Sequence, residues 1–139
     1  APNCILPGDL DGDGDLDLVV GESSGTLNYY RNVGTPERPE FELVTDELDG
    51  IDVGRRSAPA LEDVDGDGDL DLVVGTESSG LRLFRNEGSP RSHDFEDAGR
   101  LPAAVRGLAS PDFADLDGDG RSELVSGSAS GGVLLFHRP

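Results

Sequence analysis

The chain has 139 residues, enough for one domain, and its formal net charge is −18, from 29 acidic and 11 basic residues. This acidity argues against nucleic acid or an anionic membrane surface as a partner. No apolar run reaches the length of a membrane-spanning helix, so we expect no membrane insertion. Helix signals are nearly absent, and the chain is predicted to be all-β.

Carboxylates separated by glycines cluster three times, at residues 9–17, 63–71 and 115–123. Like charges repel one another, and a bound cation removes that cost. Ca²⁺ takes about six to eight oxygen ligands, and a loop with carboxylates at alternate positions can wrap one ion. Mg²⁺ fits less well, because it demands a tight octahedron and keeps its waters. The sequence therefore predicts up to three Ca²⁺ ions per chain, one in each loop.

The predicted ligands follow from the position of each residue within its loop. Backbone carbonyls are predicted at position 7, which is Asp15, Asp69 and Arg121. Side-chain oxygens are predicted at positions 1, 3, 5 and 9, namely Asp9, Asp11, Asp13 and Asp17, then Asp63, Asp65, Asp67 and Asp71, then Asp115, Asp117, Asp119 and Glu123.

An EF-hand is excluded, because it needs Glu at position 12 of the loop and a helix on either side. Val20, Val74 and Ser126 occupy that position here. The first two loops are followed by a short β-branched run that ends in glycine, which is typical of a strand. Each loop is therefore expected inside a β-hairpin.

The loops belong to a longer internal repeat, because Asp9 and Asp63 are 54 residues apart and Asp63 and Asp115 are 52 apart. Each unit is predicted to hold four strands, of which the first two flank the acidic loop. The expected strands are 5–8, 17–21, 26–32 and 41–45; 59–63, 71–75, 81–86 and 95–98; and 111–115, 123–127 and 132–137. Residues 1–139 would form one segment of three repeats, at about 1–52, 53–104 and 105–139, the last without its fourth strand.

The second and third strands of each unit are apolar on both faces, so each sheet is expected to lie between neighbours. Four-stranded antiparallel sheets packed face to face around an axis make a β-propeller, with a period of about 40–50 residues. The 11 expected strands, at four per blade, amount to about 2.75 propeller blades.

The repeat resembles the FG-GAP/VCBS family, the propeller repeats of integrin α-subunit heads and of many bacterial surface proteins. The resemblance rests on the DxDxDGxxD loops followed by Leu-Val-Val-Gly, on Arg-Asn-x-Gly at 31–34 and 85–88, and on Phe41 and Phe95. It implies that Ca²⁺ sits in the hairpin loop of each blade and makes it rigid. The third loop departs from the pattern with Arg121 and Glu123, although the longer Glu123 carboxylate can still reach an ion.

Closure of the ring is left open by the strand count, because propellers close with about four to eight blades. Fewer than three blades leave two apolar faces uncovered. Either copies of the chain associate, two of them giving a six-bladed ring with twofold symmetry, or the chain is a piece of a longer protein. The absence of Met agrees with a processed or excised chain. We favour a homo-oligomer, with a dimer as the first expectation.

No catalytic motif is recognisable: the sequence holds no nucleophile elbow, phosphate loop, zinc spacing or Ser/His/Asp arrangement. His93 and His137 are expected at surface or edge positions, and Cys4 as a small half-buried apolar residue. Tyr29 and Tyr30 offer a ligand platform, but adjacent strand residues face opposite ways, so one of the two is expected to pack between blades. We therefore do not expect an enzyme.

Two classes of function remain. The first is a non-catalytic, calcium-binding adhesion scaffold, extracellular or at the cell surface with the periplasm as an alternative, that binds protein or carbohydrate through its rim loops. The second is a propeller segment of a larger extracellular enzyme, such as a polysaccharide lyase. A converging set of Arg, Lys, Tyr or His would favour the second, and the chain has no Lys at all. We favour the first.

Overall fold

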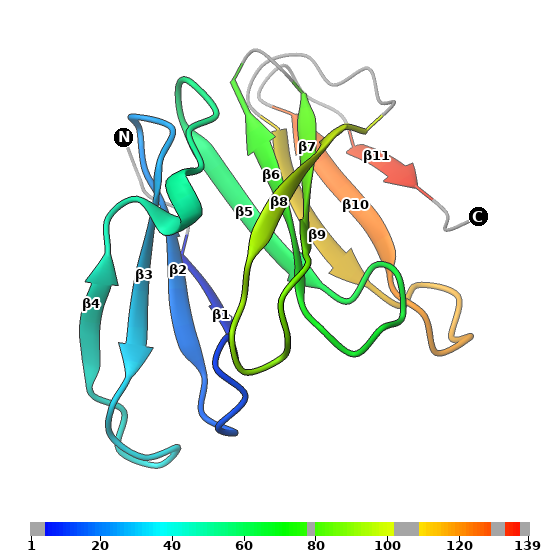
Figure 1. Ribbon diagram of the computed structural model, residues 1–139. Helices are drawn as coiled ribbons and strands as arrows, with labels where there is room; N and C mark the ends of the chain where they lie inside the picture. Colours follow the sequence, from blue (N-terminus) through cyan, green and yellow to red (C-terminus); the bar gives the residue numbers. More distant parts are fainter. Residues whose placement is uncertain (1–4, 78–79, 102–108, 129–132, 137–139) are drawn as a thin grey trace.

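The computed structural model describes residues 5–77, 80–101, 109–128 and 133–136, which form three antiparallel sheets in a row (Figure 1). Sheet 1 holds β1 (Ile5–Gly8), β2 (Asp17–Gly21), β3 (Leu27–Asn32) and β4 (Phe41–Thr45), in that spatial order. Sheet 2 holds β5 (Ser57–Glu62), β6 (Asp71–Thr76), β7 (Leu81–Asn86) and β8 (Phe95–Arg100), and sheet 3 holds β9 (Ala109–Ala114), β10 (Glu123–Ser128) and β11 (Val133–Phe136).

The predicted all-β class and the four-stranded antiparallel sheets are confirmed, with strand ends that differ from the expected ones by at most two residues. β5 and β9 begin two residues earlier than expected, and β8 ends two residues later. Within the described residues sheet 3 has three strands and the three sheets form an open row. The described part contains no helix long and apolar enough to cross a membrane.

A short 3-10 helix, η1 (Leu48–Gly50), lies between β4 and β5 and was not predicted from the sequence. Its Leu48 side chain is buried in the core between sheets 1 and 2. Asp49 adopts a left-handed backbone conformation with φ of 49°, which turns the chain sharply there. The segment after β4 therefore reaches over to sheet 2 before the chain enters β5.

The hydrophobic core lies between neighbouring sheets. Val19, Leu27 and Tyr29 of sheet 1 share one cluster with Leu72, Val74, Phe84 and Phe95 of sheet 2. A second cluster joins Val73 and Leu81 of sheet 2 to Ala109 and Leu124 of sheet 3. β6 is buried along its whole length, as predicted for a strand between two neighbours. β3 and β7 are less buried than expected, because Arg31 and Arg85 are exposed.

Glycine residues allow neighbouring sheets to approach one another closely. A Cβ added at Gly75 would lie 2.0 Å from the carbonyl oxygen of Ala109, and one at Gly21 equally close to that of Ser57. The equivalent Gly127 in sheet 3 has nothing within 4 Å of such a Cβ. The first strand of each following sheet thus lies against the second strand of the sheet before it, through glycine.

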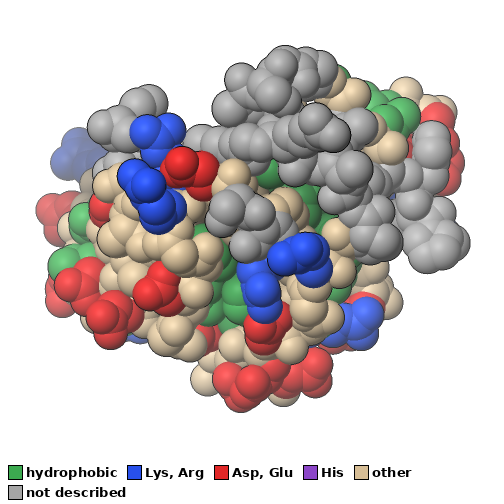
Figure 2. Space-filling model, turned by 90° about the horizontal axis from the view of Figure 1, so that it is seen from above, with side chains coloured by type: hydrophobic (Ala, Val, Ile, Leu, Met, Phe, Trp, Pro, Cys, Tyr) green, Lys and Arg blue, Asp and Glu red, His purple; other side chains and the backbone are tan. Residues whose placement is uncertain are grey.

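Both ends of the row expose apolar side chains, and Figure 2 shows hydrophobic surface at each end. We call the side of sheet 1 that no other described sheet covers its outer face, where Tyr30 is paired with Leu18 and Leu43, and Ile5 with Val20. The outer face of sheet 3 carries Val125, Val133 and Leu135. Ile5 is 64% exposed and Val133 72%, so these faces lack the cover that the same positions have in sheet 2.

Candidate metal centres

Each acidic loop is organised by the first aspartate of its motif. Asp9 accepts the N–H of Gly12 at 2.8 Å with Oδ1 and the N–H of Gly14 at 3.0 Å with Oδ2. Both glycines have positive φ, 72° and 91°, a conformation that L side chains rarely adopt. Asp63 and Asp115 make the same pair of bonds in their loops. The glycines therefore let the loop curl around one carboxylate.

The carboxylates at positions 3 and 5 each accept the backbone N–H two residues further on. In the first loop Asp11 accepts from Asp13 at 3.3 Å, and Asp13 from Asp15 at 2.8 Å. In the third loop Arg121 donates its backbone N–H to Asp119 at 2.8 Å, as Asp15 and Asp69 do in theirs. The arginine at position 7 therefore leaves the backbone of the third loop unchanged.

The residue at position 9 ties each loop to the sheet. Asp17 is fully buried, and it accepts the N–H of Leu10 at 3.0 Å and that of Asn32 at 2.9 Å, with a different oxygen for each. Asp71 repeats both bonds, with Val64 and Asn86. Glu123 accepts the N–H of Leu116 at 2.8 Å. This anchoring role, from the loop to the end of the third strand, was not anticipated from the sequence.

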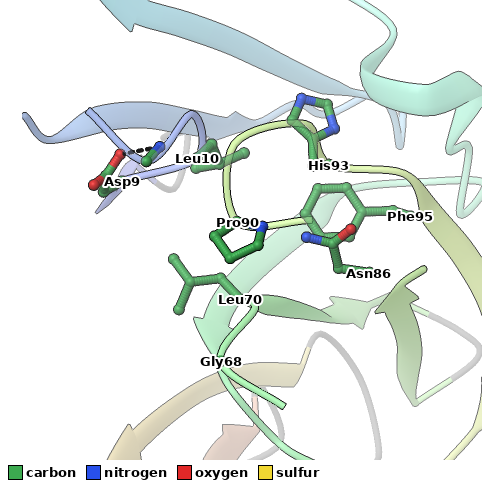
Figure 3. Close-up of a pocket in the computed structure, with 9 residues that line it drawn as sticks. Asp9, Leu10, Gly68, Leu70, Asn86, Pro90, His93 and Phe95 are labelled. Carbon is green, nitrogen blue, oxygen red and sulfur yellow. Dashed lines mark hydrogen bonds between the residues drawn. The ribbon is translucent and has the colours of Figure 1, made fainter. Parts of the chain in front are cut away.

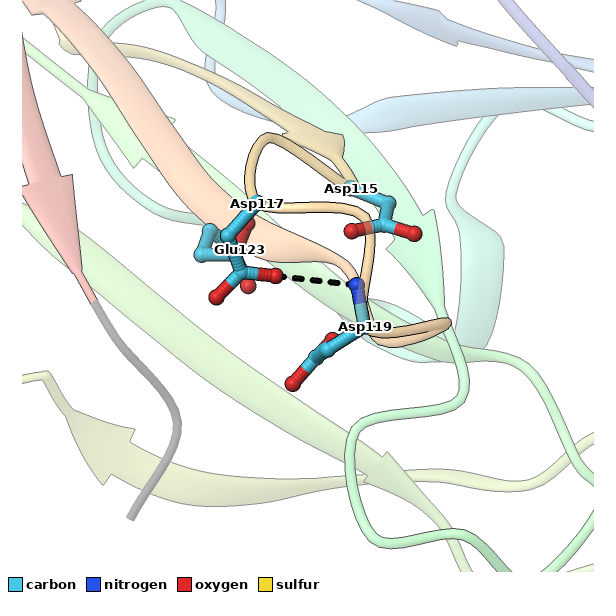
Figure 4. A group of neighbouring side chains, drawn as sticks. All are labelled: Asp115, Asp117, Asp119 and Glu123. Atoms are coloured by element: carbon cyan, nitrogen blue, oxygen red, sulfur yellow. Dashed lines mark hydrogen bonds between the residues drawn. The ribbon is translucent and has the colours of Figure 1, made fainter.

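Three groups of carboxylates converge, each with one oxygen per residue within 4.8 Å of the others. The third loop brings together all four predicted side-chain ligands (Figure 4). The structure does not bring Asp17 or Asp67 into the groups of their own loops. The groups are Asp9, Asp11 and Asp13; Asp63, Asp65 and Asp71; and Asp115, Asp117, Asp119 and Glu123.

Burial and neighbouring negative charges shift the pKa values of some of these carboxyls. The pKa of Asp11 is raised, first by burial and then by the charges of Asp17 and Asp13. Burial also raises the pKa of Asp71, against the N–H bonds from Asn86 and Val64 that lower it. A raised pKa means that the ionised form of the carboxyl is disfavoured, and a bound cation would favour it.

Asp63 behaves in the opposite way. Burial acts to raise its pKa, but the backbone N–H groups of Gly68, Gly66 and Asp67 together lower it. The N–H groups of the loop therefore stabilise the negative charge at position 1.

The Arg-Asn-x-Gly motif supports the loops from the third strand. The Asn32 side-chain oxygen accepts the N–H of Gly34 at 2.9 Å and that of Glu40 at 3.1 Å. Asn86 makes the same two bonds with Gly88 and Asp94. The motif therefore closes the Pro/Gly-rich loop and fixes the strand end whose N–H the position-9 aspartate accepts.

The family model for FG-GAP-like repeats matches residues 9–74 and 63–126, which together span well over half of the chain. The chain belongs to the FG-GAP repeat family. Repeats of this family suggest a β-propeller-like module, often bind calcium, and are typical of extracellular proteins. Comparison with curated proteins and with solved structures gives no significant match.

A cavity of about 220 Å³ lies between the first two acidic loops and the connection from β7 to β8 (Figure 3). Leu10 points toward the segment that carries Pro90 and His93. The His93 ring stacks on Phe95 with centroids 5.2 Å apart and meets Tyr29 edge-on at 5.5 Å. Its Nδ1 lies 3.1 Å from Asp49 Oδ2. His93 therefore joins sheets 1 and 2, where the sequence indicated a surface or edge residue.

Of the two tyrosines singled out in the sequence, Tyr29 packs between sheets 1 and 2, while Tyr30 is half-buried on the outer face of sheet 1. The prediction that one of the pair packs inward is confirmed. The Tyr29 hydroxyl is buried and has no well-formed hydrogen bond among the described residues. Burial raises its pKa to about 12, although the nearby Arg31 guanidinium acts to lower it. Cys4 and His137 lie outside the described residues.

Proposed function

We propose that the chain is a calcium-binding propeller module with up to three Ca²⁺ ions, one per loop. The observation that carries the proposal is the convergence of at least three carboxylates in each of three equivalent loops. A donor set made only of oxygen suits a hard cation, and flexible loops with many carboxylates suit Ca²⁺ better than Mg²⁺. The raised pKa of Asp11 and Asp71 agrees with loops whose charges need a counter-charge.

Calcium that binds only the folded chain would raise its free energy of unfolding. Extracellular calcium modules have dissociation constants of about 10⁻⁴–10⁻³ M. At free calcium about 100 times the dissociation constant, each site adds about 2.7 kcal/mol to the free energy of unfolding. For three small sheets in an open row this is a large share of typical domain stability, about 5–15 kcal/mol.

Thermal unfolding with millimolar Ca²⁺ and then with excess chelator tests the proposal. We expect a substantially lower melting temperature in chelator, and calorimetry should count up to three sites. Asp119→Asn should remove one site, because Asp119 belongs to the converging group of the third loop. Asp46→Asn is the matched control, since Asp46 is exposed between β4 and η1. An identical melt with and without calcium would sink the metal assignment.

We further propose a non-catalytic scaffold, extracellular or at the cell surface, that binds protein or carbohydrate through its rim loops in adhesion. Family membership supports this setting, because such repeats are typical of extracellular proteins. The competing proposal is a propeller segment of a larger extracellular enzyme such as a polysaccharide lyase. A cell-adhesion assay and a glycan array of the chain separate the two. Adhesion of cells to the chain favours the scaffold, whereas polysaccharide binding without adhesion, together with depolymerisation by a longer protein that contains this segment, favours the enzyme.

Self-association is the proposed way to cover the outer faces, with a dimer that completes a six-bladed ring. Its support is that residues equivalent to those on the outer faces, such as Leu72 and Phe84 for sheet 1 and Val73 and Leu81 for sheet 3, are buried in sheet 2. Static light scattering should then give about twice the 14.6 kDa chain mass in calcium. A stable monomer would contradict self-association and leave the calcium proposal intact.

A further inference from the structure

Two arginines at equivalent positions face the acidic loops. Arg31, near the end of β3, places Nε 3.5 Å from Asp11 Oδ2. Arg85, near the end of β7, places Nη1 3.9 Å from Asp65 Oδ2. Asp11 and Asp65 are both at position 3 of their loops, and each belongs to a converging carboxylate group. The same contact is therefore built twice, from the strand to the predicted ion site. Arg31 also contacts the Tyr29 hydroxyl, whereas Leu83 stands at the equivalent position in β7.

Both Arg–Asp contacts are partly exposed to solvent. Each arginine side chain is 48% exposed, and the aspartates are 21% and 28% exposed. Exposed ion pairs of this kind contribute little to stability, about 0–1 kcal/mol. A side chain held this weakly can leave its carboxylate when a stronger counter-charge arrives.

We propose that Arg31 and Arg85 are internal counter-ions that compete with the cation for the carboxylate at position 3. The inference rests on the proposed calcium binding and adds the residues that set its affinity. Without calcium, each guanidinium neutralises part of the charge of the loop and holds the loop near its folded shape. With calcium, the same positive charge repels the ion, so these arginines weaken binding while they stabilise the empty loop.

An alternative role for the arginines predicts the opposite change in calcium affinity. If each arginine only positioned its aspartate for the metal, removal of the arginine would weaken calcium binding. If it competes, removal strengthens binding. A unit charge and a divalent charge a few ångströms apart in water correspond to roughly a tenfold change in dissociation constant, which salt reduces. We therefore expect an effect of about three- to tenfold at the affected site.

The experiment uses Arg31→Gln, Arg85→Gln and the double variant, in calcium titrations by calorimetry at fixed ionic strength and in melts without calcium. We expect a dissociation constant about three- to tenfold lower at the affected site, a lower melting temperature without calcium, and a larger calcium-induced rise. Arg55→Gln removes the same charge from the loop before β5, away from the acidic loops, and should change none of these three quantities. Arg31→Lys keeps the charge and should restore most of the wild-type affinity.

The outcomes separate the two proposals. A wild-type chain that binds no calcium overturns both the calcium function and the counter-ion role. A wild-type chain that binds calcium, with Gln variants that bind it equally or more weakly, overturns the counter-ion role alone. Gln variants that stay unfolded even in saturating calcium, as judged by circular dichroism, also overturn it, because the arginines would then be structural.

Discussion

Phe41 and Phe95 open the fourth strands of sheets 1 and 2 and pair with equivalent asparagines, Asn32 and Asn86. Phe95 is 5% exposed, whereas Phe41 is 43% exposed. Phe95 lies in the core cluster with Tyr29 of sheet 1 and Leu48 of η1, and no described sheet precedes Phe41. The burial of the same residue type at equivalent positions of the two sheets is thus decided by the neighbouring sheet.

The glycines of the second strands show the same contrast between a covered and an uncovered sheet, here for the backbone. Gly75 has the carbonyl of Ala109 against it, whereas Gly127 has open space. The glycine of the second strand is therefore in contact with a neighbouring strand at the interface between sheets 2 and 3. The equivalent glycine has no such contact on the outer face of sheet 3. Variants at such matched positions separate what a residue contributes inside its sheet from what it contributes between sheets.

The largest effect is expected from truncation of the buried aromatic ring. Phe95→Ala should lower the free energy of unfolding by about 3–5 kcal/mol, because it leaves a cavity in the core between sheets 1 and 2. Phe41→Ala should cost less than about 1 kcal/mol in a monomer, because the ring is already half exposed. Chemical denaturation measures both. Equal losses would mean that Phe41 is also covered, for example by a second copy of the chain.

A methyl group at the glycine contact should have the next largest effect. Gly75→Ala should cost about 1–3 kcal/mol, because the new Cβ forces sheet 3 away from sheet 2. Gly127→Ala is the control and should be nearly neutral in the isolated chain, with denaturant midpoints as the measurement. If Gly127→Ala abolishes a dimer seen by light scattering while the fold persists, the outer face of sheet 3 is the self-association surface.

The contact across sheets through Asp49 should matter somewhat less. Its Oδ2 accepts the N–H of Phe95 at 2.9 Å and lies 3.1 Å from His93 Nδ1. Asp49→Ala should cost about 1–2 kcal/mol, since a backbone N–H loses its acceptor. Asp49→Asn keeps an acceptor oxygen and tolerates the left-handed backbone, so it should cost less. Equal losses for the two variants, by thermal unfolding, would point to charge as the main contribution.

The smallest change in stability is expected at the Tyr29 hydroxyl. Tyr29→Phe should change the free energy of unfolding by less than about 1 kcal/mol near neutral pH, because removal of a poorly bonded buried hydroxyl is offset by loss of its contact with the Arg31 guanidinium. The pKa of Tyr29 is about 12 in the folded state against an ordinary 10.0, so the unfolded state loses this proton first. Wild-type stability should therefore fall as pH rises from 10 to 12, and less so in Tyr29→Phe. A parallel loss in both proteins would contradict the buried, high-pKa phenol.

Much of the candidate site was predictable from local sequence. Alternating carboxylates and glycines identified all three loops, because the curl of each loop is made by contacts within about six residues, such as Asp9 with Gly12 and Gly14. The double role of Asp17 was not predictable, since its second partner, the N–H of Asn32, belongs to another strand. The Arg31–Asp11 contact was not predictable for the same reason, since Arg31 also belongs to the third strand.

The sequence by itself determined the repeat, the strands and the acidic loops, because these follow from side-chain alternation, β-branched runs and glycines that permit positive φ. Only the tertiary structure decided that Phe95 is buried while Phe41 is exposed, and that η1 brings Asp49 to His93. Local signals fix the backbone of each sheet. The burial of each face depends on which sheet lies next to it, and residues far apart in the chain decide that.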